Sequence, residues 1–501
     1  MPERVTTPAA ATITSRQRIL QASDRRPSGS GDEYDSHMPR RIALIDLVGL
    51  SPALIGPHTP AIAAFAREKG GVRTMRPTLP AVTTSVQTSM LTGVGPAEHG
   101  IVGNGWMDPA SGEVALWKQS DGLVQAERLW DTARRRDPDV TCANICWWYA
   151  MHTSCDTVVT PRPIYKADGR KIPDCLTEPA DLRDRLTRAL GPFPLFRFWG
   201  PAADITSTRW IADAAIKVER DTTPTITLVY LPHLDYGLQK LGPDHPEIPQ
   251  HLRELDHEVA RLLEHFTSRG VEPILVSEYG IVPVTDAVAP NRILRDAGLL
   301  YWREEQGREM VDPGTSDAFA VADHQVAHVR LGRGGLARRD EIAALFASTA
   351  GVAQVLQGEE RSKAGLDHPR AGDLVLVSDR DRWFTHDWWH DDAKMPDFQR
   401  TVDIHRKPGY DPRELFVDPA IRFPKLAIGS RLIRRKLGFR TLLDVIATDP
   451  KLVRGSHGRI DQGLGWDGVL VADAAANLDD EADGRVPCTA VRDLALGTIF
   501  G

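Results

Sequence analysis

The 501-residue sequence contains no uninterrupted apolar run of about 18 residues, the length that a membrane-spanning helix requires. It also lacks an excess of positive charge, because 61 lysines and arginines are outnumbered by 68 aspartates and glutamates. A nucleic acid polymer is normally bound by a basic surface. The sequence therefore predicts neither a membrane nor a nucleic acid polymer as a partner.

Cysteine is scarce, with five residues in the whole chain. They do not form the repeated pairs of a zinc finger, and a disulfide-rich secreted domain would need many more cysteines in a much shorter chain. We expect reduced, mostly buried thiols in a cytoplasmic protein. The five are Cys142, Cys146, Cys155, Cys175 and Cys488.

Residues 1–38 also lack the continuous apolar segment of a signal peptide and are rich in Thr, Ser, Ala, Pro and Arg. We expect a disordered N-terminal tail. A translation start at Met38 and an organellar transit peptide are alternatives, and the acidic residues at 32–35 disfavour the second. The length of the chain suits one large α/β domain with insertions, or two or three domains.

Strand-like and helix-like segments alternate after this tail. Helical spacing of apolar residues marks 252–266, and Thr59-Pro60 marks another helix start. Such alternation predicts an α/β fold with a mainly parallel sheet and helices on both faces. The strand-like runs lie at 41–46, 140–148, 225–231, 273–280 and 468–472.

A tryptophan- and charge-rich stretch interrupts this pattern late in the chain. We interpret 39–380 as an α/β core, 381–440 as a cap-like insertion, and 441–501 as a return to the core.

Three carboxylates follow strand-like runs. Asp46, Asp235 and Glu278 each come at or just after the end of such a run. A single acid there is usually a helix cap, but three at one sheet edge favour a metal site. His233 lies two residues before Asp235, so an extended backbone would direct both side chains to the same face. Gly455 and Gly458 permit a tight loop that holds His457 at this edge.

A hydroxyl-rich segment at 80–93 runs from a proline into a short helix that Gly93 ends. It places a threonine hydroxyl, that of Thr83 or Thr84, beside the free N–H groups of a helix N-terminus, where anions bind. Threonine becomes a nucleophile only when a base or a metal lowers the pKa of its hydroxyl.

The order of these segments, with His99-Gly100-Ile101-Val102-Gly103-Asn104 after the helix, resembles the nucleotide pyrophosphatase/phosphodiesterase branch of the alkaline phosphatase superfamily. The resemblance implies two divalent metal ions, Zn²⁺ or Mn²⁺/Mg²⁺, and hydrolysis of a phosphodiester, pyrophosphate or related bond in a small-molecule substrate. It makes Thr83 the nucleophile and Asn104 the holder of a phosphate oxygen. The metal ligands it implies are Asp46, Thr83, Asp235, Glu278 and His457.

The chain departs from this family pattern where the resemblance implies more histidines. It has Gln239 in place of one histidine, and Glu278-Tyr279 in place of Asp-His. In one interpretation the site is rebuilt with Gln239, Tyr279 and other oxygen-rich ligands, with His233 or His405 supplying the missing nitrogen. Such hard ligands favour Mn²⁺ or Mg²⁺ over Zn²⁺.

In another interpretation at least one metal is lost, and the protein is a weak enzyme or a silent binder of an anionic metabolite or partner protein. Phosphoryl transfer to an acceptor other than water, as in a mutase, is a third. Arg162, Lys171 and Arg406 are candidate contacts to a substrate phosphate, although each also suits a surface role. The sequence sets no oligomeric state.

Overall fold

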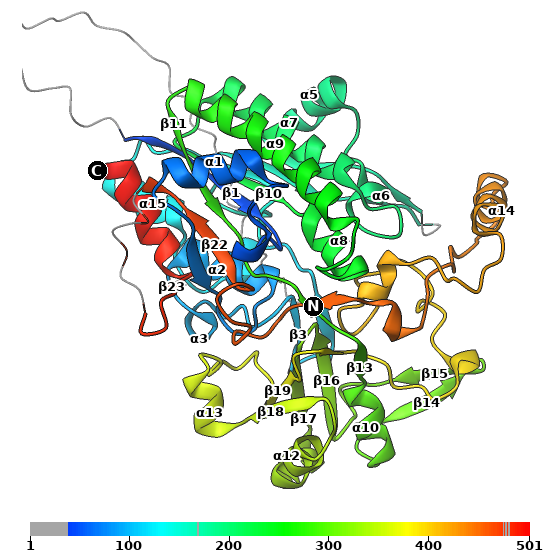
Figure 1. Cartoon of the computed structure of the whole chain (residues 1–501). Helices are drawn as coiled ribbons and strands as arrows, with labels where there is room; N and C mark the ends of the chain where they lie inside the picture. Colours follow the sequence, from blue (N-terminus) through cyan, green and yellow to red (C-terminus); the bar gives the residue numbers. More distant parts are fainter. Residues whose placement is uncertain (1–38, 168–169, 474, 476–477, 479–480) are drawn as a thin grey trace, which may run out of the picture. The chain divides into compact units, whose positions relative to one another are not determined.

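The computed structural model describes residues 39–501, apart from 168, 169, 474, 476, 477, 479 and 480. The expected disordered tail at 1–38 lies outside the described residues. The centre of the fold is a nine-stranded sheet in the order β23-β2-β22-β11-β1-β10-β5-β6-β9 (Figure 1). These strands are β1 (Arg41–Leu47), β2 (Arg73–Arg76), β5 (Cys142–Ile145), β6 (Thr157–Pro161), β9 (Cys175–Glu178), β10 (Ile226–Leu231), β11 (Val271–Val276), β22 (Gly468–Val471) and β23 (Val486–Pro487).

The middle of this sheet is parallel. β11, β1, β10, β5 and β6 pair in parallel, whereas β22 runs antiparallel to both β11 and β2, and β9 runs antiparallel to β6. β1 and β10 are buried along almost their whole length, as expected for strands that are covered on both faces. β5 ends at Ile145, earlier than predicted, because Cys146 adopts a φ of 71° that leaves the strand conformation.

Helices cover both faces of the sheet, which confirms the predicted fold class (Figure 1). α7 (Ile205–Thr222) and α9 (Ile248–Ser268) pack against each other and against β10 and β11. α15 (Ala490–Phe500) packs on β1 and on α2 (Thr83–Thr92). The buried residues of α9 recur at helical spacing, so one stripe of this helix joins the main core.

A second, antiparallel sheet lies within residues 39–380, the region predicted as one core. Its strand order is β16-β17-β19-β18, and it has a hydrophobic core of its own. The strands are β16 (Ala318–Asp323), β17 (Val326–Leu331), β18 (Val352–Leu356) and β19 (Leu374–Ser378). Asp323, the last residue of β16, and His324, in the turn that leads to β17, are both buried.

The segment interpreted as a cap has two different parts. It contains β20 (Arg382–Phe384), the short 3-10 helices η3 (Asp392–Lys394) and η4 (Pro412–Leu415), and α14 (Pro424–Lys436). α14 buries none of its residues, whereas Tyr410, just before η4, is buried and donates a hydrogen bond to Gln239. The part around residue 410 therefore reaches the core.

The prediction that His233 and Asp235 share one face was wrong, because the backbone is helical there. Pro232 already has helical dihedral angles, and α8 (His233–Leu241) begins directly after it. Side chains two positions apart on a helix diverge by about 200°. Asp235 and Gln239, four residues apart, are the pair that shares a face.

Two expectations about composition can be compared with the structure. The five cysteines are buried and unpaired, as predicted. Within the described part of the chain, we find no helix that combines the length and the apolar character needed to cross a membrane.

Candidate active site

Asp46, Thr83 and Glu278 come together at the carboxyl edge of the central strands. Asp46 lies in β1, Glu278 follows β11 by two residues, and Thr83 is the first residue of α2. Gln87, one turn further along α2, donates from Nε2 to Asp46 Oδ2 at 3.1 Å and to Glu278 Oε1 at 2.7 Å. One amide thereby holds two buried carboxyl groups beside the threonine.

Gln87 was not among the predicted site residues, although its spacing from Thr83 indicates that it lies on the same face. It lies four residues after Thr83, so a helix places both side chains on one face. Its own Oε1 accepts a hydrogen bond from the backbone N–H of Trp148 at 2.9 Å, which fixes the amide orientation.

The two adjacent threonines have different surroundings. The hydroxyl of Thr83 lies 2.9 Å from the hydroxyl of Tyr279, and its interaction with Glu278 opposes the rise in the pKa of that carboxyl. The hydroxyl of Thr84 donates to the backbone carbonyl of Gly103 at 2.7 Å. Only the first of these hydroxyls faces the carboxyl groups.

A second pair, Asp235 and His457, lies nearby. Asp235 Oδ1 is 3.8 Å from His457 Nε2, and Asp235 Oδ2 accepts a hydrogen bond from Gln239 Nε2 at 2.8 Å. His457 Nδ1 lies 2.7 Å from the carbonyl oxygen of Ala81. Because that carbonyl can only accept, Nδ1 carries the proton and Nε2 keeps its lone pair.

Tyr279 connects the two groups. Its ring stacks on the His457 ring with centroids 3.6 Å apart and planes 8° apart. Its hydroxyl lies 2.9 Å from that of Thr83, and its interaction with Asp235 opposes the rise in the pKa of that carboxyl. The phenol therefore lies where the family pattern has an imidazole, and it offers an oxygen instead of a nitrogen.

Asn104 is held by an aspartate that the sequence analysis did not single out. Asp323 accepts from the Asn104 backbone N–H at 2.8 Å and from Asn104 Nδ2 at 3.0 Å. Asn104 Oδ1 accepts from the N–H of Thr84 at 3.2 Å. The asparagine is thus fixed at the N-terminus of α2.

His324 is a second residue that was missed. It has a φ of 59°, and its Nδ1 lies 2.8 Å from Asp323 Oδ1. The centroid of its ring lies 3.7 Å from the ring centroids of Tyr410 and His457. An apolar run that ends in an acid, the signal that marked Asp46, also precedes His324 and could have identified it.

Burial controls the charge of the three acids. It raises the pKa of Asp46 to about 7. Burial, and then the nearby charge of Glu278, raises the pKa of Asp235 to about 8. The pKa of Glu278 is well above its usual value, first through burial and then through Asp46. A cation among these groups would favour their ionised forms and reverse these shifts.

The residues present fit divalent cations. Buried polar atoms are normally hydrogen-bonded. Besides His324 Nε2, four atoms of the predicted metal ligands are buried without a hydrogen-bond partner among the described residues: Asp46 Oδ1, Asp235 Oδ1, Glu278 Oε2 and His457 Nε2. Three carboxylate oxygens and one imidazole nitrogen form an oxygen-rich donor set.

Two histidines named from the sequence have other partners. His233 Nε2 contacts His251 and Glu254 on α9. His405 Nδ1 lies 3.4 Å from the carbonyl oxygen of Leu116. In these contacts neither supplies a nitrogen to the buried acids.

The three basic candidates also contact other groups. Arg162 approaches the sulfur of Met151, Lys171 donates to the carbonyl of Val402 at 3.1 Å, and Arg406 lies 3.6 Å from Asp397. A substrate role for them stays a prediction.

Comparison with known proteins identifies the family of the chain. The model of the type I phosphodiesterase / nucleotide pyrophosphatase family matches residues 42–411. An uncharacterized pyrophosphatase/phosphodiesterase of Schizosaccharomyces pombe is 24% identical over 246 residues, which are 47% of this chain and 42% of the relative. The match thus spans less than half of that relative.

Solved structures of similar fold cover most of the chain. Phosphonoacetate hydrolase from Sinorhizobium meliloti 1021, in complex with phosphonoacetate, has a TM-score of 0.59 at 18% identity and covers 92% of this chain and 96% of its own. Murine ectonucleotide pyrophosphatase/phosphodiesterase 5, in complex with AMP, has a TM-score of 0.54 at 13% identity and covers 92% and 95%. Both are of the alkaline phosphatase superfamily. With its buried acids and threonine at the sheet edge, the chain belongs to the type I phosphodiesterase / nucleotide pyrophosphatase family, a family of hydrolases.

Proposed function

We propose that this protein is a metal-dependent hydrolase of a phosphodiester, pyrophosphate or related phosphoryl bond in a small molecule, with Thr83 as nucleophile. One observation carries the proposal: the Thr83 hydroxyl lies at a helix N-terminus, near the buried Asp46 and Glu278 carboxyl groups, each of which has one oxygen without a hydrogen-bond partner. Family membership supports phosphoester hydrolysis. The ligands named for the solved neighbours, phosphonoacetate and AMP, support a small phosphoryl substrate.

Two divalent ions would be held by two groups of side chains. Asp46, Glu278 and Thr83 form the first, and the second consists of Asp235 and His457, with Gln239 beside them donating to Asp235. When bound, such ions would lower the pKa of the threonine hydroxyl and offset negative charge on the phosphoryl group. The excess of oxygen over nitrogen favours Mn²⁺ or Mg²⁺ over Zn²⁺.

The chain's own groups would perform the substitution in two steps. The Thr83 oxygen forms a bond to phosphorus while the bond to the leaving group breaks and the leaving group takes the electron pair, and the hydroxyl proton passes to solvent water. The free N–H groups of α2 and the Asn104 amide stabilise the phosphoryl oxygens. Water then cleaves the threonine–phosphate bond and regenerates the hydroxyl. The murine neighbour is described as inactive when a threonine is replaced by alanine, which supports this role for a threonine.

A screen of metals against substrates tests the proposal. Monoester, diester, pyrophosphate, phosphonate and sulfate substrates are each assayed with added Mn²⁺, Mg²⁺ and Zn²⁺, alongside elemental analysis of the protein. We expect bound divalent metal and hydrolysis of a diester or pyrophosphate, fastest with Mn²⁺ or Mg²⁺. Well under one metal per chain, and no turnover with any ion, would instead support a silent binder of an anionic metabolite or partner protein.

The silent binder has one specific observation in its favour, since Gln239 and Tyr279 remove two imidazoles from the family's ligand pattern. Transfer to an acceptor other than water is separated from hydrolysis by adding an alcohol and looking for its phosphorylated product. Both reactions share the first step, so only the product distinguishes them.

Gln87→Leu should lower activity by about 10- to 100-fold, the usual cost of losing a side chain that orients metal ligands. The amide is the hydrogen-bond donor shared by Asp46 and Glu278, and leucine cannot replace it. The measurement is activity against metal concentration, in which the midpoint should move to higher metal. Gln354→Leu, an exposed glutamine of β18, is the matched control and should behave as wild type.

A further inference from the structure

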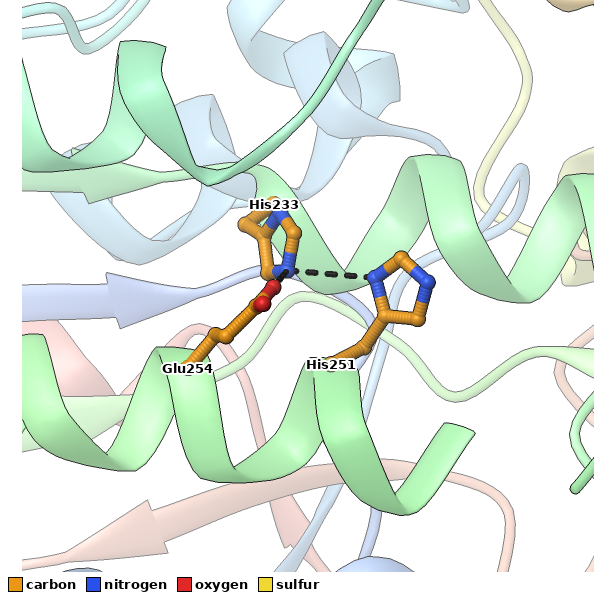
Figure 2. Close-up of side chains that lie close together, drawn as sticks. All are labelled: His233, His251 and Glu254. Carbon is orange, nitrogen blue, oxygen red and sulfur yellow. Dashed lines mark hydrogen bonds and ion pairs between the residues drawn. The ribbon is translucent and has the colours of Figure 1, made fainter. Parts of the chain in front are cut away.

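We propose a separate site for a transition-metal ion such as Zn²⁺ between α8 and α9, formed by His233, His251 and Glu254. The three side chains point toward one another from the two helices (Figure 2). His233 Nε2 lies 3.1 Å from His251 Nδ1 and 3.1 Å from Glu254 Oε2. In the part of the chain that the structure describes, these three residues form a possible metal-binding group, because one ligand atom from each lies within 4.8 Å of the other two.

The spacing suits a small tetrahedral ion. Ligand atoms bonded to zinc at 2.0–2.1 Å lie about 3.3 Å apart at the corners of a tetrahedron, close to the two separations seen here. Without an ion, a proton on His233 Nε2 would have to serve both neighbours, and a proton on His251 Nδ1 instead would leave the Glu254 carboxylate facing a lone pair of His233. A cation uses a lone pair from each of the three atoms at once. Two imidazoles and one carboxylate are a ligand set that zinc accepts readily.

A cavity leaves the fourth position open. It has a volume of about 150 Å³ and is lined by His233, His251, Tyr236, Lys240 and Glu247. A water molecule occupies about 30 Å³ in the liquid, so the cavity accommodates a water or a small anion as the fourth ligand.

Gly237 provides independent support for this placement of His251. Glycine is unfavourable inside a helix, yet it occupies the middle of α8. A Cβ at Gly237 would lie only 3.0 Å from His251 Nδ1 and 3.1 Å from its Cε1. The glycine thus gives the imidazole room to lie against α8 with the nitrogen directed at His233.

The proposed ion would join the first turn of α8 to α9. That turn also contains Asp235, two residues after His233, on a different side of the helix. The site is therefore separate from the buried acids but fixes the element that presents one of them. This metal site is an inference separate from the proposed hydrolysis, because its test measures the binding of Zn²⁺ and not the activity of the protein.

The test counts Zn²⁺ ions on the full-length protein after equilibration with Zn²⁺ alone. Wild type should retain one more ion per chain than His251→Phe and Glu254→Gln, which keep the shape of the side chains but remove a ligand. His257→Gln and Glu264→Gln alter the same residue types at exposed positions of α9 and should retain the wild-type number. In an Asp46→Asn, Asp235→Asn background, the ion that remains should still depend on His251 and Glu254.

A crystal of the wild-type protein equilibrated with Zn²⁺ provides a check that needs no variant. Anomalous scattering at the zinc edge should show a peak among His233 Nε2, His251 Nδ1 and Glu254 Oε2. Equal ion counts in wild type, His251→Phe and Glu254→Gln, or no peak among these atoms, would show that the cluster is only a hydrogen-bonded contact between helices.

Discussion

Thr83→Ala is expected to reduce hydrolysis by about 10³-fold or more, because it removes the oxygen that attacks phosphorus. The substitution is small, and it deletes a hydroxyl that is hydrogen-bonded to Tyr279 and lies near Glu278. The protein should therefore stay folded and keep its metal. The measurement is turnover of the best substrate from the screen, with metal content determined on the same sample.

Two further variants, Thr83→Ser and Thr84→Ala, test whether Thr83 is the nucleophile. Thr83→Ser keeps a hydroxyl on the nucleophile and should recover much of the activity. Thr84→Ala removes a hydroxyl that donates to Gly103 and should cost far less than Thr83→Ala. Unchanged turnover in Thr83→Ala, or a larger loss in Thr84→Ala, would show that Thr83 is not the nucleophile.

Arg413→Met is expected to give the largest loss of stability, about 3–5 kcal/mol in the free energy of unfolding. The Arg413 side chain is 1% exposed and donates to Asp387 through both terminal nitrogens, at 2.7 and 2.6 Å. It also donates from Nε to Asp411 at 2.7 Å. These contacts hold the pKa of both aspartates below the usual value despite burial. Without Arg413, the buried Asp387 carboxylate loses its two-nitrogen partner, and Asp411 is left with its ion pair to Lys407.

The measurement is the midpoint of denaturant-induced unfolding. Arg303→Met removes an exposed arginine from its pair with Glu305 and should change stability by no more than about 1 kcal/mol. Equal effects of the two substitutions would mean that the buried network adds nothing beyond a surface ion pair.

The buried ion cluster also supports the candidate site. Lys407 completes it, with Nζ 2.9 Å from Asp411 and 2.8 Å from Glu414. Tyr410 lies between these residues in sequence and donates to Gln239 at 2.9 Å. Arg413→Met should therefore lower activity in parallel with stability, because the loop that orients Gln239 loses its anchor.

Local sequence patterns correctly predicted several strands and one long helix of the core. The apolar runs that predicted β1, β10, β11 and β22 are strands, and the segment at 252–266 lies inside α9. These predictions succeeded because strand and helix periodicities are local properties of the chain. The rule that ligands gather at the carboxyl ends of parallel strands then placed Asp46 and Glu278 at one edge.

Local patterns failed where a contact joins distant segments. The direction of His233 depended on α8 beginning directly after Pro232, and its partners on α9 are 18 and 21 residues away in sequence. Asp323 holds Asn104 across 219 residues, and His324 reaches His457 from the second sheet. The periodicity of one segment does not indicate which distant segment it contacts.

The sequence by itself determined the family, the α/β class, and which residue types are available for chemistry. Only the tertiary structure decided which oxygen faces which neighbour: that Thr83 faces the acids while Thr84 turns to Gly103, and that Gln87 joins Asp46 to Glu278. The physical reason is that residue type fixes what a side chain can donate or accept, whereas burial and partner geometry, set by packing between distant segments, fix what it does.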